Sequence, residues 1–204
     1  MQTEVEAKFL DIDHDEIRKK LVSIGAVCEK PMRLMRRVII DNDFMKDGKD
    51  AFLRVRDEGD RVVMTYKQFD ELSVDGAKEI EVIVNSFDDT VLLLAQIGMP
   101  YNSFQESKRE TWKHGDVEVV LDEWPWLKPY IEIEGPSEVS LKEVVNKLGL
   151  DWSSAVFGDV MAAYRAQYSH LSLTDTVGTI SVVKFNDPLP ALFKPTRIDK
   201  DLQT

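Results

Sequence analysis

The sequence predicts an α+β protein organised around an eight-stranded antiparallel β-barrel, a tunnel with a polar, charged interior and amphipathic helices covering its outside. Three observations support this fold class. Strand-like segments with alternating charged and apolar residues recur, short turns rich in glycine and aspartate join several of them, and three such segments lead into a helix that ends at a glycine. Because successive side chains of a strand point to opposite faces, one face of the sheet is charged and the other is apolar.

The N-terminal segment Glu4-Val5-Glu6-Ala7-Lys8 shows this alternation most clearly. Glu79-x-Glu81 and Glu132-x-Glu134 repeat it with carboxylates, and Arg54-x-Arg56 repeats it with cations. A single strand of this kind is ordinary in a sheet that has one solvated face. Its recurrence along the chain indicates that carboxylates and cations share one face of an extensive sheet.

Further strands are expected at about 35–41, 51–57, 61–68, 104–113 and 116–122, and they bring the total to eight. Turns at Asp47-Gly48, Glu58-Gly59-Asp60 and His114-Gly115-Asp116 separate several of them. Such hairpin loops favour antiparallel pairing, and eight strands are enough to curl into a closed barrel. Closure would turn one face of the sheet into an interior.

Helices are expected after three of the strands. Asp13 precedes the first helix, which ends near Gly25; Ser86 precedes the second, which ends near Gly98; and the third begins at about Ser140 and ends near Gly149. A fourth helix is expected over 153–169. We assign residues 1–170 to the tunnel domain and 171–204 to a loop-like C-terminal extension, with a short strand over 179–183 and no assigned role.

Composition narrows the class of protein. The chain has 204 residues, a formal net charge of −11 and a single cysteine, Cys28. It shows neither a leader-like N-terminus nor an apolar run of roughly 18 to 20 residues, which a membrane span requires. We therefore expect a cytoplasmic protein with no nucleic-acid partner and no membrane partner, in which anions are held by local groups of cations. The sequence leaves the oligomeric state open, and a homodimer is compatible with it.

The charged face carries fourteen ionisable residues, and burying so many charges as stability devices would cost several kcal/mol each. A closed barrel must therefore stay wet and bind ions. The predicted inward-facing residues are Glu4, Glu6, Lys8, Arg37, Arg54, Arg56, Lys67, Glu79, Glu81, Arg109, Glu118, Asp122, Glu132 and Glu134.

The two signs of charge predict two kinds of ligand. Glu4 and Glu6, facing Glu132 and Glu134, would form an all-oxygen site suited to Mg²⁺ or Mn²⁺. The cations outnumber what one carboxylate ligand needs and suit a chain of phosphates, which guanidinium groups bind with two parallel hydrogen bonds. These cations are Lys8, Arg54, Arg56, Lys67, Arg109 and Arg37. A metal bridging phosphoryl oxygens makes phosphoanhydride cleavage the natural reaction. Trp112, Trp124 and Trp126 are expected to pack in the core rather than to stack on a base.

The segment Glu4-x-Glu6-x-Lys8 resembles the N-terminal signature of the CYTH superfamily. These triphosphate tunnel metalloenzymes include thiamine triphosphatases, inorganic tripolyphosphatases and class IV adenylate cyclases. The order of the later motifs is also similar, over roughly residues 2–170: Arg54-x-Arg56, Lys67, Glu79-x-Glu81, Arg109, Asp122 and Glu132-x-Glu134. The resemblance implies an eight-stranded barrel in which acidic residues hold a divalent metal and basic residues hold the triphosphate.

By this resemblance the metal ligands would be Glu4, Glu6, Asp122, Glu132 and Glu134, and the phosphate ligands would be Lys8, Arg54, Arg56, Lys67 and Arg109. We expect a Mg²⁺- or Mn²⁺-dependent hydrolase of inorganic tripolyphosphate (polyphosphate) or of an organic triphosphate, with Glu79, Glu81 and Lys8 as the catalytic residues.

Two alternatives remain. A class IV adenylate cyclase would convert ATP to cyclic AMP and pyrophosphate in the same tunnel. The chain departs from that pattern, because 33–41 lacks the His-Phe element of those cyclases and Ser107 stands where a second basic residue is common. A noncatalytic polyphosphate- or nucleotide-binding module would bind the ligand without releasing product.

Overall fold

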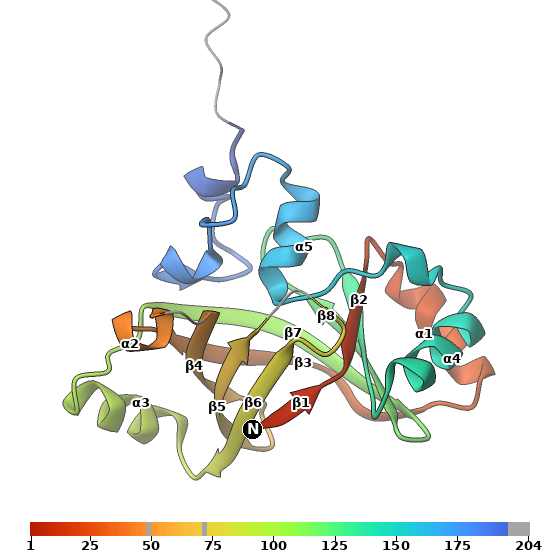
Figure 1. The fold of residues 1–204 in the computed structure, drawn as a ribbon, viewed down its shortest axis with the longest axis horizontal. Coiled ribbons are helices and arrows are strands. Elements are labelled where there is room, and N and C mark those ends of the chain that lie inside the picture. The colour runs from red at the N-terminus through yellow and green to blue at the C-terminus, as the bar shows by residue number, and fades with distance from the viewer. Residues whose placement is uncertain (48–49, 71–72, 196–204) are drawn as a thin grey trace, which may run out of the picture.

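A computed structural model describes residues 1–47, 50–70 and 73–195. Gly48 of the predicted Asp47-Gly48 turn and the last nine residues of the C-terminal extension lie outside the described residues. The described chain forms a single antiparallel sheet that curls into a barrel (Figure 1). Its strands are β1 (Gln2–Glu4), β2 (Glu6–Leu10), β3 (Val27–Ile40), β4 (Asp50–Asp57), β5 (Val62–Phe69), β6 (Ala77–Val84), β7 (Ser103–His114), β8 (Val117–Glu123), β9 (Tyr130–Glu134) and β10 (Val182–Val183).

The N-terminal run closes the barrel. The strand order is β1-β6-β5-β4-β3-β7-β8-β9-β2, so β1 pairs with β6 at one edge and β2 pairs with β9 at the other. The two strands are separated by Val5, where Gly135 N donates to Val5 O (3.1 Å) and Glu6 N donates to Val74 O (2.9 Å). The predicted antiparallel barrel is confirmed. The strand count differs from the predicted eight because this run is split at Val5 and because β10 adds a parallel pair with β7.

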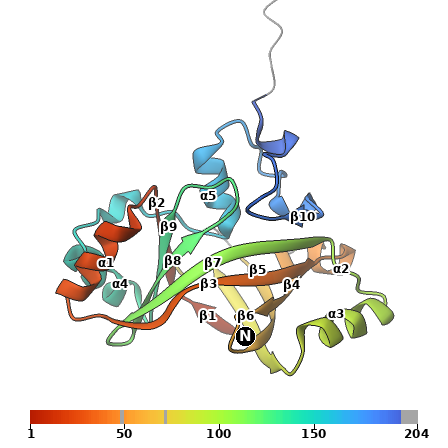
Figure 2. The ribbon, with the colours of Figure 1, turned by 180° about the vertical axis from the view of Figure 1, so that it is seen from behind.

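Helices cover much of the apolar outer face of the barrel, as the alternation predicts, while Ile80 and Val82 on the outer face of β6 are 52% and 44% exposed. The helices α1 (His14–Ser23) and α4 (Glu138–Lys147) pack over β2, β8 and β9 (Figure 1). Phe9 and Ile131 pair across β2 and β9 and are 1% and 0% exposed beneath them. The helices α2 (Asp43–Lys46) and α3 (Phe87–Gln96) pack against β3 and β4 in a second apolar cluster (Figure 2). Burial of this outer face leaves the charged face inside.

Two predicted helix starts are confirmed. Asp13 Oδ1 accepts from Asp15 N (2.8 Å) and Glu16 N (3.1 Å) at the start of α1, and Ser86 caps α3. These side chains satisfy backbone donors that have no partner within the helix.

Two other predicted helix boundaries were wrong. The helix α4 begins at Glu138 rather than near Ser140, because Ser137 is its cap and Ser140 is the third helical residue of the capping box. The expected helix over 153–169 is instead a short 3₁₀ helix, η1 (Trp152–Ser154), and a shorter α5 (Val160–Gln167). Gly158 has φ of 106°, a conformation that interrupts a helix, and Asp159 then caps α5.

The chain beyond α5 packs on one end of the barrel. It contains η2 (Val177–Thr179), β10 and η3 (Ala191–Phe193). The short strand expected over 179–183 is present as β10, which pairs with the start of β7. Within the described ranges, no helix has the length and apolar character needed to cross a bilayer.

Candidate active site

The inner faces of the strands line a cavity of about 1280 Å³. Of the fourteen residues predicted to point inward, twelve line it: Glu4, Glu6, Arg37, Arg54, Arg56, Lys67, Glu79, Glu81, Arg109, Glu118, Glu132 and Glu134. The other two, Lys8 and Asp122, are 2% and 1% exposed and lie within the wall of the barrel. The barrel therefore brings the predicted site residues together around one cavity.

Lys8 lies between two carboxylates in the barrel wall. Its Nζ is 3.3 Å from Glu6 Oε1 and 3.1 Å from Glu132 Oε1, and register places Glu132 directly opposite it on β9. Burial disfavours the charged amine, but the two carboxylates outweigh burial and raise the pKa of Lys8. Glu132 is half-buried, and this burial would raise its pKa, yet Lys8 and then Arg109 hold the pKa of Glu132 well below its usual range. Both groups are therefore ionised at neutral pH.

Arg109 forms the most extensive ion pair of the site. Its Nε donates to Asp122 Oδ1 (2.7 Å), and its Nη2 donates to Asp122 Oδ2 (2.5 Å) and Glu132 Oε2 (2.6 Å). Asp122 is therefore engaged with Arg109, and its role as a metal ligand stays a prediction. Lys67 is similarly placed, with Nζ 2.5 Å from Glu4 Oε2 and 3.7 Å from Glu6 Oε1.

The arginines Arg37, Arg54 and Arg56 are less well satisfied. Among the residues that the structure describes, the buried side-chain atoms without a hydrogen-bond partner are the Nε atoms of these three arginines and Glu79 Oε2. Arg37 donates through Nη2 to Ser107 Oγ and lies 4.4 Å from the ring centroid of Trp124. Arg54 makes a long contact of 3.4 Å to Thr65 Oγ1. Each guanidinium group thus keeps donor capacity that the protein does not use.

These arginines also repel one another. Burial and then the charges of Arg56, Arg54 and Arg109 hold the pKa of Arg37 well below its usual range. Burial and then Arg54 and Arg109 lower the pKa of Arg56 to about 10. A group of buried cations with free N–H donors is an anion site, because an anion would satisfy the donors and offset the repulsion.

Glu58 belongs to this site and was missed by the sequence reasoning. Glu58 is 3% exposed. Its Oε1 accepts a hydrogen bond from Arg56 Nη2, and its Oε2 accepts one from Arg61 Nε at 2.9 Å. Burial would raise the pKa of Glu58, but Arg56 and then Arg61 lower it to about 2. Glu58 lies in the predicted turn at Gly59, so its polarity was read as a turn signal. Its position just after Arg54-x-Arg56 was the available clue.

A second region of the cavity is rich in carboxylates. Burial and a hydrogen bond with Glu4, reinforced by that neighbour's charge, raise the pKa of Glu79 to about 8. Desolvation by the barrel and then the charges of Glu4, Glu6 and Glu118 raise the pKa of Glu134 to about 7. Glu81 is exposed, and Thr65 Oγ1 donates to its Oε2 at 3.5 Å. Carboxylates held together against their repulsion suit a divalent cation.

The chemistry of these donors fits a hard cation, since all of them are carboxylate oxygens. In the described part of the chain, no group of three or more acidic, histidine or cysteine side chains is already arranged to hold a metal ion. The reason lies in the lysines, because Lys67 and Lys8 draw Glu4, Glu6 and Glu132 toward themselves. A cation at these carboxylates would compete with the two lysines.

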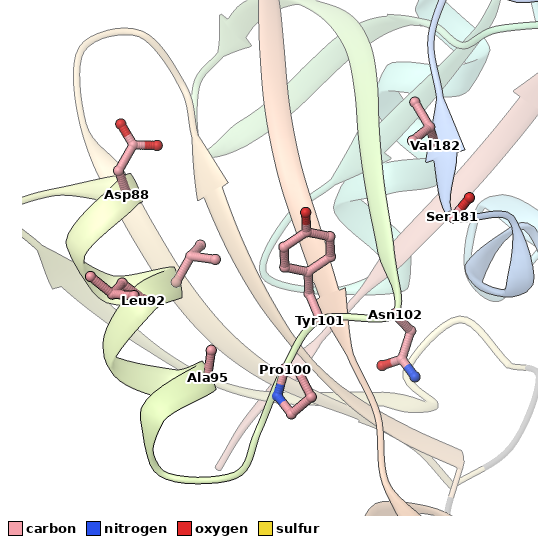
Figure 3. A pocket seen from close by; sticks show the side chains of 9 residues that line it. Asp88, Leu92, Ala95, Pro100, Tyr101, Asn102, Ser181 and Val182 are labelled. Carbon is pink, nitrogen blue, oxygen red and sulfur yellow. The ribbon is translucent and has the colours of Figure 1, made fainter.

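A second pocket of about 660 Å³ lies outside the barrel, between α3 and the segments around Tyr101 and Val182 (Figure 3). Asp88 and Leu92 line it on the α3 side. Asp88 is its sole charged lining residue among those described, so it offers none of the paired charges found inside the barrel.

Comparison with known proteins agrees with the fold. The CYTH domain family model matches residues 2–155, and the chain belongs to this family. A protein of Pyrococcus horikoshii is similar in structure, with a TM-score of 0.64 and 19% sequence identity over 74% of this chain and 93% of that chain. A candidate adenylate cyclase from Vibrio parahaemolyticus has a TM-score of 0.66 and 14% identity, over 80% of this chain and 98% of that chain.

A candidate adenylyl cyclase from Hippeastrum, which has a dominant triphosphatase activity, has a TM-score of 0.54 and 14% identity, over 80% of this chain and 96% of that chain. A search of curated protein sequences found no match. At these identities the similar structures establish the tunnel fold. They do not establish the reaction, which depends on the site.

Proposed function

We propose that this protein is a divalent-metal-dependent triphosphatase that hydrolyses inorganic tripolyphosphate or an organic triphosphate inside the barrel. The observation that carries the proposal is the group of Arg37, Arg54 and Arg56, whose buried Nε atoms lack a hydrogen-bond partner and whose side chains line the same cavity as a carboxylate-rich region. Phosphoryl oxygens are the ligands that such a group of guanidinium donors recognises best. Membership of the CYTH family supports the same substrate class.

In this proposal the cations divide into two groups. Arg37, Arg54 and Arg56 bind the phosphate chain directly, because they line the cavity and each keeps an Nε donor without a partner in the protein. Lys67 and Arg109 line the cavity and already pair with carboxylates, so they would contact the end of the phosphate chain that approaches the acidic residues, while Lys8 holds Glu6 and Glu132 from within the wall. The substrate would thus lie along the tunnel, across the boundary between the two charges.

The acidic residues Glu4, Glu6, Glu132 and Glu134 are the proposed metal ligands, with Asp122 behind them holding Arg109. A bound Mg²⁺ or Mn²⁺ would neutralise charge on the phosphoryl oxygens. In this proposal Glu79, which lines the cavity and whose pKa burial and Glu4 raise to about 8, accepts the proton of the attacking water. Water oxygen bonds to phosphorus as the anhydride oxygen leaves with its electron pair.

Glu81 and the buried Lys8 complete the proposed catalytic residues: Glu81, exposed and lining the cavity, orients water, and Lys8 holds Glu132. A cytoplasmic location and a homodimeric assembly are further proposals. Size-exclusion chromatography with light scattering tests the assembly.

One incubation tests the proposed reaction. The protein is mixed with Mg²⁺ or Mn²⁺ and, separately, with tripolyphosphate, thiamine triphosphate and ATP, and orthophosphate, pyrophosphate and cyclic AMP are resolved. Orthophosphate release that requires the metal supports the triphosphatase. Cyclic AMP with pyrophosphate would instead establish the cyclase alternative, which the name of the Vibrio protein favours. Tight binding without any product would establish the noncatalytic alternative.

A further inference from the structure

The interior of the tunnel changes in character along its length. Strand β4 presents Phe52, Arg54 and Arg56 in succession on its inner face. Register sets Phe52 opposite Lys67 on β5, and Phe69 lies on the same face two residues beyond Lys67. The two phenylalanine rings therefore lie at the end of the tunnel where β4 begins, and the arginines lie deeper. This end of the cavity therefore carries two aromatic rings beside the charged residues Asp41, Lys46 and Asp50, of which Lys46 and Asp41 form an ion pair.

The C-terminal segment, defined here as residues 171–193, lies at the same end. Its strand β10 pairs with the first residues of β7, and Ser103 Oγ donates to Ile180 O at 2.6 Å. Ser103 is opposite Ile39 near the end of β3, and the neighbouring Ile40 is opposite Leu53 near the start of β4. Figures 1 and 2 both show the C-terminal segment over this end of the barrel.

The C-terminal segment is held firmly in this position. Arg165 of α5 donates to the carbonyl oxygens of Ser172 (3.1 Å), Leu173 (3.0 Å) and Asp175 (3.1 Å), which fixes the backbone of the loop. Phe193 is 1% exposed in an apolar cluster that joins this segment to α5 and the barrel. These contacts give the loop a defined surface toward the tunnel.

That surface forms part of the cavity wall, through Leu173, Thr174, Thr176, Val177, Gly178 and Thr179. Pockets for drug-sized organic ligands occupy roughly 300 to 1,000 Å³. The cavity of about 1280 Å³ therefore has room for an organic group in addition to a phosphate chain. The half-buried ring of Phe52 offers a stacking surface, with the buried Phe69 beside it under Lys67. The threonine hydroxyls bond within the loop, and each keeps a lone pair or a proton for a further hydrogen bond.

We propose that residues 173–179, with Phe52 and Phe69, form a subsite for an aromatic group attached to the triphosphate. The subsite makes an organic triphosphate the preferred substrate and selects among such compounds by the shape of the ring. The inference rests on the proposed function for the position of the phosphates. It assigns part of the specificity to residues 173–179, which lie outside the matched domain that ends at residue 155.

The test compares kcat/KM for ATP and thiamine triphosphate with that for tripolyphosphate. In the wild-type protein, at least one organic triphosphate should exceed tripolyphosphate. Phe52→Ala should lower that preference about tenfold, since one aromatic contact is worth about that factor. Leu173→Ala, at a side chain that is 81% exposed on the rim, should lower it about threefold without affecting folding. Leu92→Ala on α3, also an exposed leucine (58%) but outside the tunnel, is the matched control and should leave the preference unchanged.

The outcomes separate this inference from the proposed function. Hydrolysis of tripolyphosphate in preference to both organic compounds, or equal losses for all substrates in the two variants, would overturn the subsite and leave the triphosphatase standing. If the wild-type protein hydrolyses none of the three, the proposed function fails. In that case titration calorimetry measures the dissociation constants of the same three compounds. Tighter binding of an organic triphosphate than of tripolyphosphate, weakened in the two variants, would support the subsite, and the absence of this preference would overturn it. Circular dichroism melts establish that each variant is folded.

Discussion

Arg109 and Asp122 face each other across β7 and β8 and form an ion pair with two parallel hydrogen bonds, from Nε to Oδ1 at 2.7 Å and from Nη2 to Oδ2 at 2.5 Å. Asp122 is 1% exposed, and Arg109 reaches past it to Glu132 at 2.6 Å. The pair thus links the wall of the barrel to the charged cavity. Its position implies that it supports both the fold and the site.

Asp122→Asn should therefore destabilise the protein strongly. The amide keeps the shape of the carboxylate but leaves the guanidinium group of Arg109 with Glu132 as its remaining acidic partner. Breaking a buried ion pair by changing one partner costs about 3 to 5 kcal/mol. Urea unfolding monitored by tryptophan fluorescence measures the change. A loss below about 1 kcal/mol would show that Arg109 does not depend on Asp122.

Arg54→Ala should weaken substrate binding more than turnover. Each charge-assisted hydrogen bond is worth about 1.5 to 3 kcal/mol, which corresponds to a rise in KM of about tenfold to a hundredfold. Steady-state hydrolysis of tripolyphosphate measures both constants. Arg36→Ala is the matched control, because Arg36 pairs with Asp57 and does not line the cavity. An unchanged KM in the Arg54 variant would remove Arg54 from the phosphate site.

Glu4→Gln and Glu6→Gln should raise the metal concentration needed for half-maximal activity, or abolish turnover. The amide keeps one oxygen and loses the charge that attracts a hard cation. Activity measured at increasing Mn²⁺ concentration gives the metal dependence of turnover. Electron paramagnetic resonance of bound Mn²⁺ measures metal affinity independently of catalysis. Glu138→Gln on α4, where the carboxylate pairs with Lys142 outside the barrel, should match the wild type. Wild-type metal dependence in both Glu4 and Glu6 variants would contradict the metal assignment.

Glu58 should make the free energy of unfolding depend on pH in the acidic range. Its folded-state pKa of about 2 lies below the ordinary value of 4.5, so the ionised form is favoured by folding. The stabilisation is therefore complete above pH 4.5 and is lost as the pH falls from 4.5 toward 2. We expect a contribution of about 2 kcal/mol after allowance for screening of the partly exposed Arg61.

The measurement is urea unfolding of the wild type and of Glu58→Gln at pH 7 and pH 3. The stability difference between the two proteins should be largest at pH 7 and should shrink at pH 3. A difference that does not change with pH would show that the ion pairs of Glu58 contribute nothing through its charge. Asp60→Asn, at a more exposed carboxylate paired with Lys30, should have a smaller effect.

The barrel and the residues that point into it could be predicted because a strand encodes its two faces by simple alternation. Glu6 and Lys8 in the first strand illustrate this, since a period of two places both on the charged face in any sheet. Helix boundaries were less predictable. Ser137 and Ser140 have the same side chain, and their contacts alone show which of them caps α4.

Partners across the barrel could not be predicted. The role of Glu58 depends on Arg56 and Arg61 turning toward it, and the unused donor of Arg37 depends on Ser107 and Trp124 occupying the other sides of the guanidinium group. Arg37 and Ser107 are far apart in the chain, whereas Arg56 and Arg61 are near neighbours of Glu58 whose side-chain orientation the alternation does not specify. Alternation specifies the face of the sheet on which a residue lies, but it does not specify which neighbour will form a hydrogen bond or an ion pair with its side chain.

The sequence by itself determined the charged lining of the tunnel, its apolar exterior and the kinds of ion it could attract, because these follow from residue type and period. Only the tertiary structure decided that Lys8, Lys67 and Arg109 neutralise carboxylates while Arg37, Arg54 and Arg56 keep free donors. It also decided that Leu173, Thr174 and residues 176–179 line the tunnel. The physical reason is that the ion pairs and the cavity wall are formed by distant segments, whose meeting depends on strand register and on how the C-terminal segment packs.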